Sequence, residues 1–264
     1  MIEVQGLRRR FVQGRGARAR VVQAVDGVDF VARNGCITGL LGSNGAGKTT
    51  TLRMVATLLA PDAGQIRIDG IDALRAPAAA LGRLGVLSDA RGLYPRLTAR
   101  ENIVYFARLQ GLSEATAQAR TQTLAQTLEL HALLDRRTEG FSQGERMKTA
   151  LARALVHDPP NIILDEPTNG LDVMATRALR RTLQRLRDEE GKCIVFSTHV
   201  MQEVERLCDR VVVIARGRTV AEDSVAELCA RTGRTDFEQA FVDLAFAEPS
   251  PALEMPADHR RPAR

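Results

Sequence analysis

The chain has 264 residues, a net charge of +5 and 44% hydrophobic residues, so it contains enough apolar side chains for a substantial core. No apolar run approaches the roughly 18 residues that cross a bilayer, and we therefore expect a soluble protein whose membrane role would come through a partner. The four cysteines contain no C-x-x-C pair, which favours reduced cytosolic thiols over disulfides or zinc ligands.

Much of the positive charge lies near the N-terminus. Residues 13–20 form a loop rich in glycine and arginine, and the arginines of this region are Arg8, Arg9, Arg10, Arg15, Arg18 and Arg20. A solvated loop and a surface for lipid headgroups or an acidic partner are both compatible with this charge.

The remaining segments alternate between strand and helix patterns. Strands are predicted over 2–11, 21–32, 36–41, 65–69 and 84–87, with a helix over 50–59. Residues 88–157 are predicted to be a helical insertion, with a capping box at Thr98–Glu101 and a second helix over 114–130. The α/β pattern returns with strands over 161–165, 193–197 and 210–215, and with helices over 173–190, 200–208 and about 224–247. We predict one domain over 1–247 and a proline-rich disordered tail over 248–264.

The segment from 42 to 50 fits the phosphate-loop pattern G-x-x-x-x-G-K-[ST] between a strand and a helix. Its glycines allow successive N–H groups to face phosphate oxygens, at the positive end of the helix dipole. The predicted nucleotide-binding residues of this loop are Gly42, Ser43, Asn44, Gly45, Ala46, Gly47, Lys48, Thr49 and Thr50. Lys48 is predicted to reach the phosphates and Thr49 to bind Mg²⁺. The alternative is a glycine-rich turn that binds nothing.

Two carboxylates follow the apolar strand 161–165. Asp165 stands at the strand's C-terminal end, where such folds hold Mg²⁺, and Glu166 comes directly after it. We assign Asp165 to the metal and Glu166 to the general base. The alternative is an ordinary polar strand end.

A second helix start has anion-binding character. Ser142 and Glu145 have the spacing of a capping box, and the Gly144 between them belongs to the same first turn. Capping and anion binding are compatible here.

Four motifs in this order resemble the nucleotide-binding subunit of an ABC transporter: GSNGAGKTT, FSQGERMKTALARAL, IILDEPTNGLD and the STH of residues 197–199. The sequences of residues 85–89, 97–102 and 141–144 resemble the NatA-like branch, which includes sodium exporters. The resemblance implies an α/β phosphate-loop NTPase core of the ABC ATPase type, with an antiparallel edge sheet and an inserted helical subdomain.

The resemblance also implies roles for individual residues. Ser142, Gly144 and Glu145 match the signature that meets the γ-phosphate of ATP held by a second copy, and Asp172 matches the loop that crosses between copies. His199 matches the switch histidine that binds the γ-phosphate. Phe11 matches the aromatic residue that stacks on adenine, although a core strand residue is an equal alternative.

Three positions depart from the family pattern. Asp89 stands where glutamine is usual, and we expect it to contact Mg²⁺ and to sense the permease. Gln143 replaces a common glycine and Glu145 a common glutamine. These two replacements are compatible with the contact between copies.

The expected function is a Mg²⁺-dependent ATPase that binds ATP as a homodimer and powers a separate integral-membrane permease from the cytoplasmic face. Its cargo would be sodium or another small solute, and no nucleic acid is expected as a partner. An ABC-type ATPase acting on nucleic acid is the alternative function, and a regulator that binds nucleotide without turnover is a third.

Overall fold

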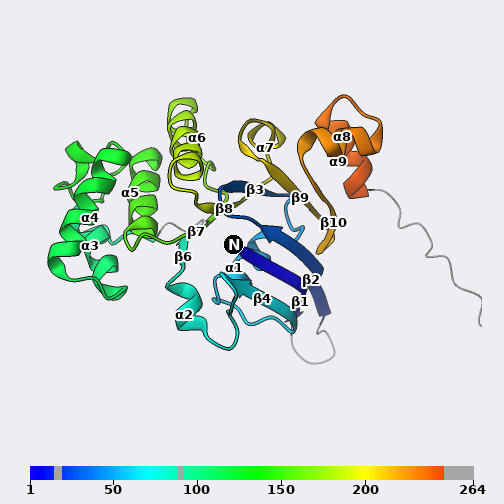
Figure 1. Ribbon diagram of the computed structural model, residues 1–264, viewed down its shortest axis with the longest axis horizontal. Coiled ribbons are helices and arrows are strands. Elements are labelled where there is room, and N and C mark those ends of the chain that lie inside the picture. The colour runs from blue at the N-terminus through cyan, green and yellow to red at the C-terminus, as the bar shows by residue number, and fades with distance from the viewer. Residues whose placement is uncertain (15–19, 89–91, 247–264) are drawn as a thin grey trace, which may run out of the picture.

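The computed structural model describes residues 1–14, 20–88 and 92–246, which fold around two sheets (Figure 1). The larger sheet has the strand order β10-β9-β3-β8-β7-β6. Its five strands from β9 to β6 are parallel, and β10 pairs antiparallel with β9. The strands are β3 (Cys36–Leu41), β6 (Leu84–Leu87), β7 (Asn161–Asp165), β8 (Cys193–Thr198), β9 (Arg210–Ala215) and β10 (Arg218–Asp223).

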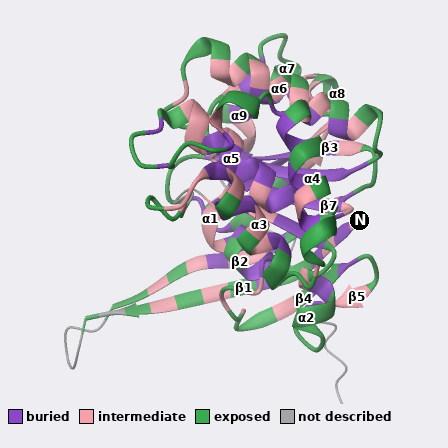
Figure 2. Cartoon of the chain, turned by 90° about the vertical axis from the view of Figure 1, so that its left-hand side faces the viewer, coloured by how far each residue is buried: buried purple, intermediate pink, exposed green. Residues whose placement is uncertain are grey.

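The smaller sheet is antiparallel and has the order β2-β1-β4-β5. It comprises β1 (Ile2–Gln13), β2 (Arg20–Ala32), β4 (Ala63–Ile68) and β5 (Ile71–Asp72). The distal part of the β1–β2 hairpin projects from the body of the protein (Figure 2). Of the arginines in this region, Arg9 and Arg10 hydrogen-bond to Asp62, and Arg8 pairs with Ala63 of β4, so these three lie beside the body of the protein. Arg15 and Arg18 lie outside the described residues.

Helix α1 (Lys48–Val55) packs between the two sheets. Its buried Leu52 and Met54 belong to one apolar cluster with Val4 of β1 and Val195 of β8. This packing fixes the N-terminus of α1 at the carboxyl end of β3. The phosphate loop is the connection between those two elements.

The helices α3 (Ala99–Leu109), α4 (Glu114–Thr127) and α5 (Gln143–Leu155), with the short η2 (His131–Leu133), lie between β6 and β7 in the chain and gather at one end of the molecule (Figure 1). Ile103 and Leu151 from these helices share an apolar cluster with Ile162 and Phe196 from the large sheet. The division of the chain into a core and a helical subdomain stays a prediction. The remaining helices are α2 (Pro77–Leu81), α6 (Val173–Asp188), α7 (Met201–Leu207), α8 (Val225–Thr232) and α9 (Phe237–Phe246).

Several predicted boundaries were wrong. Helix α1 begins two residues before the predicted 50 because Gly47, at φ 108°, forms its N-cap, and it ends early where Thr57 adopts φ 56°. Strand β10 was missed because its hairpin turns at Arg216-Gly217, where both φ values are positive without the usual Asn-Gly sequence. The predicted tail 248–264 lies outside the described residues. Within the described ranges, no helix has both the length and the apolar composition needed to cross a bilayer.

Candidate active site

The phosphate loop leaves β3, and its backbone lies against β2 and β9. A Cβ atom on Gly47 would lie 2.6 Å from the carbonyl oxygen of Ala24, and one on Gly42 would lie 2.3 Å from that of Ile214. Both positions therefore exclude any side chain. Because Gly47 caps α1 without a side chain, the first N–H groups of the helix remain available to an anion.

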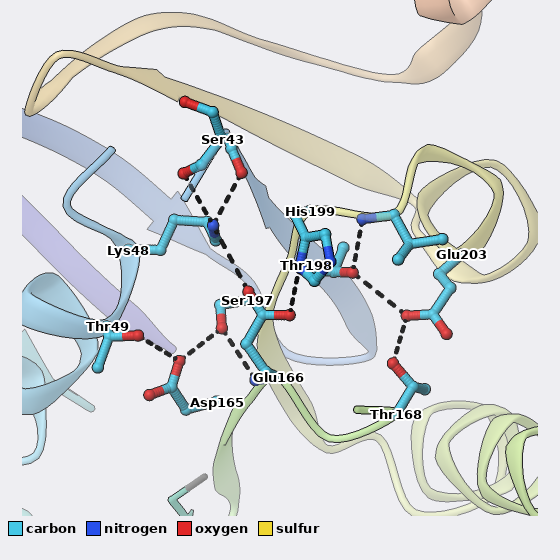
Figure 3. Close-up of polar contacts among 12 residues, drawn as sticks. Ser43, Lys48, Thr49, Asp165, Glu166, Thr168, Ser197, Thr198, His199 and Glu203 are labelled. Atoms are coloured by element: carbon cyan, nitrogen blue, oxygen red, sulfur yellow. Dashed lines mark hydrogen bonds and ion pairs between the residues drawn. The ribbon is translucent and has the colours of Figure 1, made fainter. Parts of the chain in front are cut away.

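Lys48 is a buried cation at the start of α1, with 5% of its surface exposed. Its Nζ atom donates hydrogen bonds to the carbonyl oxygens of Gly42 at 2.8 Å and Ser43 at 3.2 Å (Figure 3). The same ammonium lies 3.5 Å from Oε1 of Glu166. Lys48 thus sits between the loop backbone and the carboxylate predicted to be the general base.

Asp165 lies at the C-terminal end of β7 and is buried. Its Oδ1 atom accepts hydrogen bonds from Thr49 Oγ1 at 3.0 Å and from Ser197 Oγ at 2.6 Å (Figure 3). These hard oxygen donors fit Mg²⁺, which commonly takes one or two protein ligands and completes its shell with phosphate and water. The described residues contain no group of three or more His, Cys, Asp or Glu side chains that could hold a metal ion.

Glu166, the predicted general base, contacts the predicted switch histidine. Its backbone adopts φ 47°, which is uncommon for a residue with a side chain, and its N–H donates to Ser197 Oγ at 3.0 Å. Its Oε2 atom lies 2.9 Å from Nδ1 of His199, which the end of β8 presents to it (Figure 3). The structure therefore brings Lys48, Glu166 and His199 together.

Ser197 is a site residue that the sequence analysis did not single out. Its hydroxyl is fully buried and joins Asp165 to the backbone of Glu166. Register pairs Ser197 with Asp165 on adjacent parallel strands. The sequence could have indicated this contact, because Ser197 ends the predicted strand 193–197 and the carboxyl ends of parallel strands meet at one edge of a sheet.

The Ser142 helix start forms the predicted capping box. Glu145 N–H donates to Ser142 Oγ at 3.2 Å, and Ser142 N–H donates to Glu145 Oε2 at 2.7 Å. The second of these bonds is the main reason that the pKa of Glu145 is held below its usual range, and Arg136 at 3.5 Å adds to it. In the described chain, the hydrogen bonds and ion pairs of Ser142 and Glu145 do not reach the phosphate loop.

The starts of α5 and α6 lie beside each other. A Cβ atom on Gly144 would lie 3.3 Å from that of Ala175, and one on Gly170 would lie 3.4 Å from Nε2 of Gln143. Asp172 caps α6 as predicted, accepting a hydrogen bond from the N–H of Ala175 at 2.8 Å. The residues matched to the contact between copies therefore form one local surface.

Phe11 is half-buried on β1, and the guanidinium carbon of Arg9 lies 5.2 Å from its ring centroid. It pairs with Val22, two residues before the Ala24 that touches the phosphate loop. Phe11 is thus near the loop along β2. Asp89 lies outside the described residues.

A phosphate loop on a parallel sheet, with a carboxylate pair and a histidine at the same edge, defines a nucleotide-hydrolysing protein of the phosphate-loop class. The family described as ABC transporter matches residues 25–169, more than half of the chain, and the chain belongs to this family. It is an ATP-binding, ATP-hydrolysing subunit of the transporter type, rather than an ATPase acting on nucleic acid.

Its relatives support this class over almost the whole chain. The ABC transporter ATP-binding protein NatA of Bacillus subtilis is 42% identical over 92% of this chain and 97% of its own length. Nod factor export ATP-binding protein I of Paraburkholderia xenovorans is 44% identical over 78% of this chain and 67% of its own length.

Solved structures agree with these relatives. An ATP-binding subunit of an ABC transporter superposes with a TM-score of 0.79 at 30% identity, covering 92% of this chain and 98% of that one. A bacterial ABC transporter cassette in dimeric form has a TM-score of 0.76 at 25% identity, covering 85% of this chain and 98% of that one. The predicted ABC ATPase fold is confirmed.

Proposed function

We propose that two copies of this chain hydrolyse ATP at composite sites, each made from the phosphate loop of one copy and the Ser142 helix start of the other. A second anion-binding helix start, capped by the exposed Ser142, carries this proposal. In the part of the chain that the structure describes, the hydrogen bonds and ion pairs of Ser142 and Glu145 stay in their own helical segment, although the residues match the family's phosphate-binding signature. The dimeric form of the related bacterial cassette supports the same assembly.

Within one copy, ATP binding would use the backbone of residues 42–50 and the ammonium of Lys48. Thr49 and Asp165 would hold Mg²⁺ against the phosphates, and the ion would offset the charge that develops on them. Phe11 would stack on the adenine, since its β-strand partner Val22 lies close to the residue touching the loop. If Asp89 also contributes to the metal, its carboxylate adds a charge where the family usually has a neutral amide.

Hydrolysis would proceed by in-line attack of water on the γ-phosphate. Glu166 would orient the water and accept its proton, while Lys48 stabilises the charge on the phosphoryl oxygens. His199, held 2.9 Å from Glu166, would donate a hydrogen bond to the γ-phosphate and keep the base in line.

Across the interface, Ser142 and Gly144 would bind the γ-phosphate through the hydroxyl and the helix N-terminus. Glu145 brings a negative charge to this phosphate-binding helix start. The charge is compatible with phosphate binding because the carboxylate is already engaged by the Ser142 N–H and Arg136. Asp172, at the adjacent start of α6, would contact the other copy's site.

The subunit would work at the cytoplasmic face of the membrane, bound to a permease that carries sodium or another small solute. A cavity of about 310 Å³ beside β6 and α5, with Val86, Phe106 and His157 in its lining, supports docking of a permease segment there. The partly exposed Tyr94 and Tyr105, whose ring centroids are 5.6 Å apart, extend this surface with aromatic side chains. Asp89 follows the same strand and would pair with a basic group of the permease.

Specific ATPase activity as a function of protein concentration tests the composite site. If hydrolysis needs two copies, activity per chain rises with concentration and then reaches a plateau. Activity per chain that is constant down to nanomolar protein, where the chains are shown to be monomeric, overturns the proposal. For the permease, Tyr105→Ala should reduce recovery of the subunit with membranes, whereas replacement of the exposed Glu205 should not.

A further inference from the structure

Glu203 is a buried carboxylate that none of the roles above uses. It lies on α7 with 9% of its surface exposed, whereas Glu205 on the same helix is exposed. Removing a carboxylate from water costs free energy unless hydrogen bonds replace the lost hydration. The hydrogen bonds of Glu203 must therefore offset that cost.

One oxygen of Glu203 accepts hydrogen bonds from two threonines, one in the segment after β7 and one at the end of β8. Thr168 Oγ1 donates to Oε2 at 2.7 Å, and Thr198 Oγ1 donates to the same atom at 3.3 Å (Figure 3). Thr168 lies two residues after Glu166, and Thr198 directly precedes His199. The carboxylate thus joins the segments that carry the base and the switch histidine.

Both segments are held by further bonds next to these contacts. The N–H of Val200 donates to Thr198 Oγ1 at 3.0 Å, so the backbone is tied on both sides of His199. The N–H of Asn169 donates to the carbonyl oxygen of Glu166 at 3.1 Å, which closes the turn containing Thr168. Because Glu166 itself has a positive φ, this turn needs support from its surroundings.

We propose that Glu203 is a positioning residue that sets the relative placement of Glu166 and His199 by binding Thr168 and Thr198 together. A carboxylate suits this role because it accepts from both hydroxyl groups and donates to neither. The inference rests on the roles proposed above for Glu166 and His199.

Glu203→Ala removes the acceptor that the two threonines share. We expect kcat for ATP to fall roughly 10- to 100-fold, the scale for a small displacement of catalytic groups. KM should change little, because Lys48 and the loop backbone do not contact Glu203. Glu203→Gln keeps an oxygen that can accept both hydrogen bonds, so it should recover most of the lost activity. Glu205→Ala, on the same helix, is the matched control and should match the wild type.

A double-mutant cycle separates positioning from a general loss of structure. If Glu203 acts by holding Thr168, the double variant Thr168→Val, Glu203→Ala loses no more kcat than Glu203→Ala alone. Independent, multiplying losses overturn the proposal, as does an unchanged kcat in Glu203→Ala or a loss that only follows the fraction of unfolded protein. An inactive wild type would instead contradict the function proposed for the site.

Discussion

The Nδ1 atom of His199 lies 2.9 Å from Oε2 of Glu166, while the other oxygen of this carboxylate lies 3.5 Å from the ammonium of Lys48. One carboxylate therefore links a side chain from the phosphate loop to one from the end of β8. Since only 15% of the Glu166 side chain is exposed, these contacts define its orientation. The first prediction follows from this relationship.

Glu166→Gln should remove the base while keeping the shape of the side chain. We expect kcat to fall about 100-fold or more, the usual contribution of a general base. Affinity for ATP should be retained, since the amide still fits beside Lys48. Single-turnover hydrolysis and equilibrium nucleotide binding measure the two effects separately. An unaltered rate would exclude Glu166 as the base.

His199→Ala should lower kcat roughly 100-fold if the imidazole stabilises the γ-phosphate in the transition state. The loss in a variant carrying both His199→Ala and Glu166→Gln should be much smaller than the product of the single losses, because the two side chains act as a unit. Steady-state rates of the four proteins complete the cycle. Losses that multiply would show that the two residues act separately.

Gly47→Ala should destabilise the protein and abolish ATP binding. Its φ of 108° and the 2.6 Å approach of its Cβ position to the Ala24 carbonyl leave no room for a methyl group. The backbone strain alone is expected to cost about 1–3 kcal/mol. Gly45→Ala is the control from the same loop, because it has φ 80° but no atom within 4 Å of its Cβ position. The free energy of unfolding in urea should be lower for Gly47→Ala than for Gly45→Ala. Equal free energies would contradict this account of the loop.

Ser142→Ala should cost about 1 kcal/mol of folding stability through the lost N-cap, and it should also weaken ATP-driven association of two copies. Ser224→Ala is the matched control, because Ser224 forms the same capping box with Glu227 at the start of α8. We expect similar losses of stability, but impaired dimer formation only for Ser142→Ala. Urea unfolding and sedimentation with Mg²⁺-ATP measure the two properties. Equal ATP-driven association of the two variants would show that Ser142 does not contribute to the contact between copies.

The stabilising effect of the Glu145 charge should disappear in acid. The folded-state pKa lies below the usual value of 4.5, chiefly because the Ser142 N–H binds the carboxylate. A lowered folded pKa means that the stabilisation is complete above pH 4.5 and is lost as the pH falls through the folded value. The difference in unfolding free energy between wild type and Glu145→Gln should therefore shrink below pH 4.5. A difference that does not vary with pH would contradict this assignment.

Local patterns predicted most of the fold, including the strand and the helix on either side of the phosphate loop. The capping boxes at Thr98 and Ser142 and the strand before Asp165 were confirmed, since each depends on residues within a few positions of one another. Contacts between distant segments were missed. Ser197 binds Asp165 across 32 positions, and Glu203 binds Thr168 across 35, so neither follows from spacing along the chain. Helix ends were displaced where single residues such as Thr57 adopt positive φ values.

The central claim is that the active unit contains two copies of the chain. The mass of Glu166→Gln in solution, measured by light scattering with saturating Mg²⁺-ATP, tests this claim directly. Slow hydrolysis in this variant should preserve the closed assembly, so we predict the mass of two chains with ATP and of one chain without nucleotide. A single-chain mass for protein shown to have ATP bound would contradict the composite site.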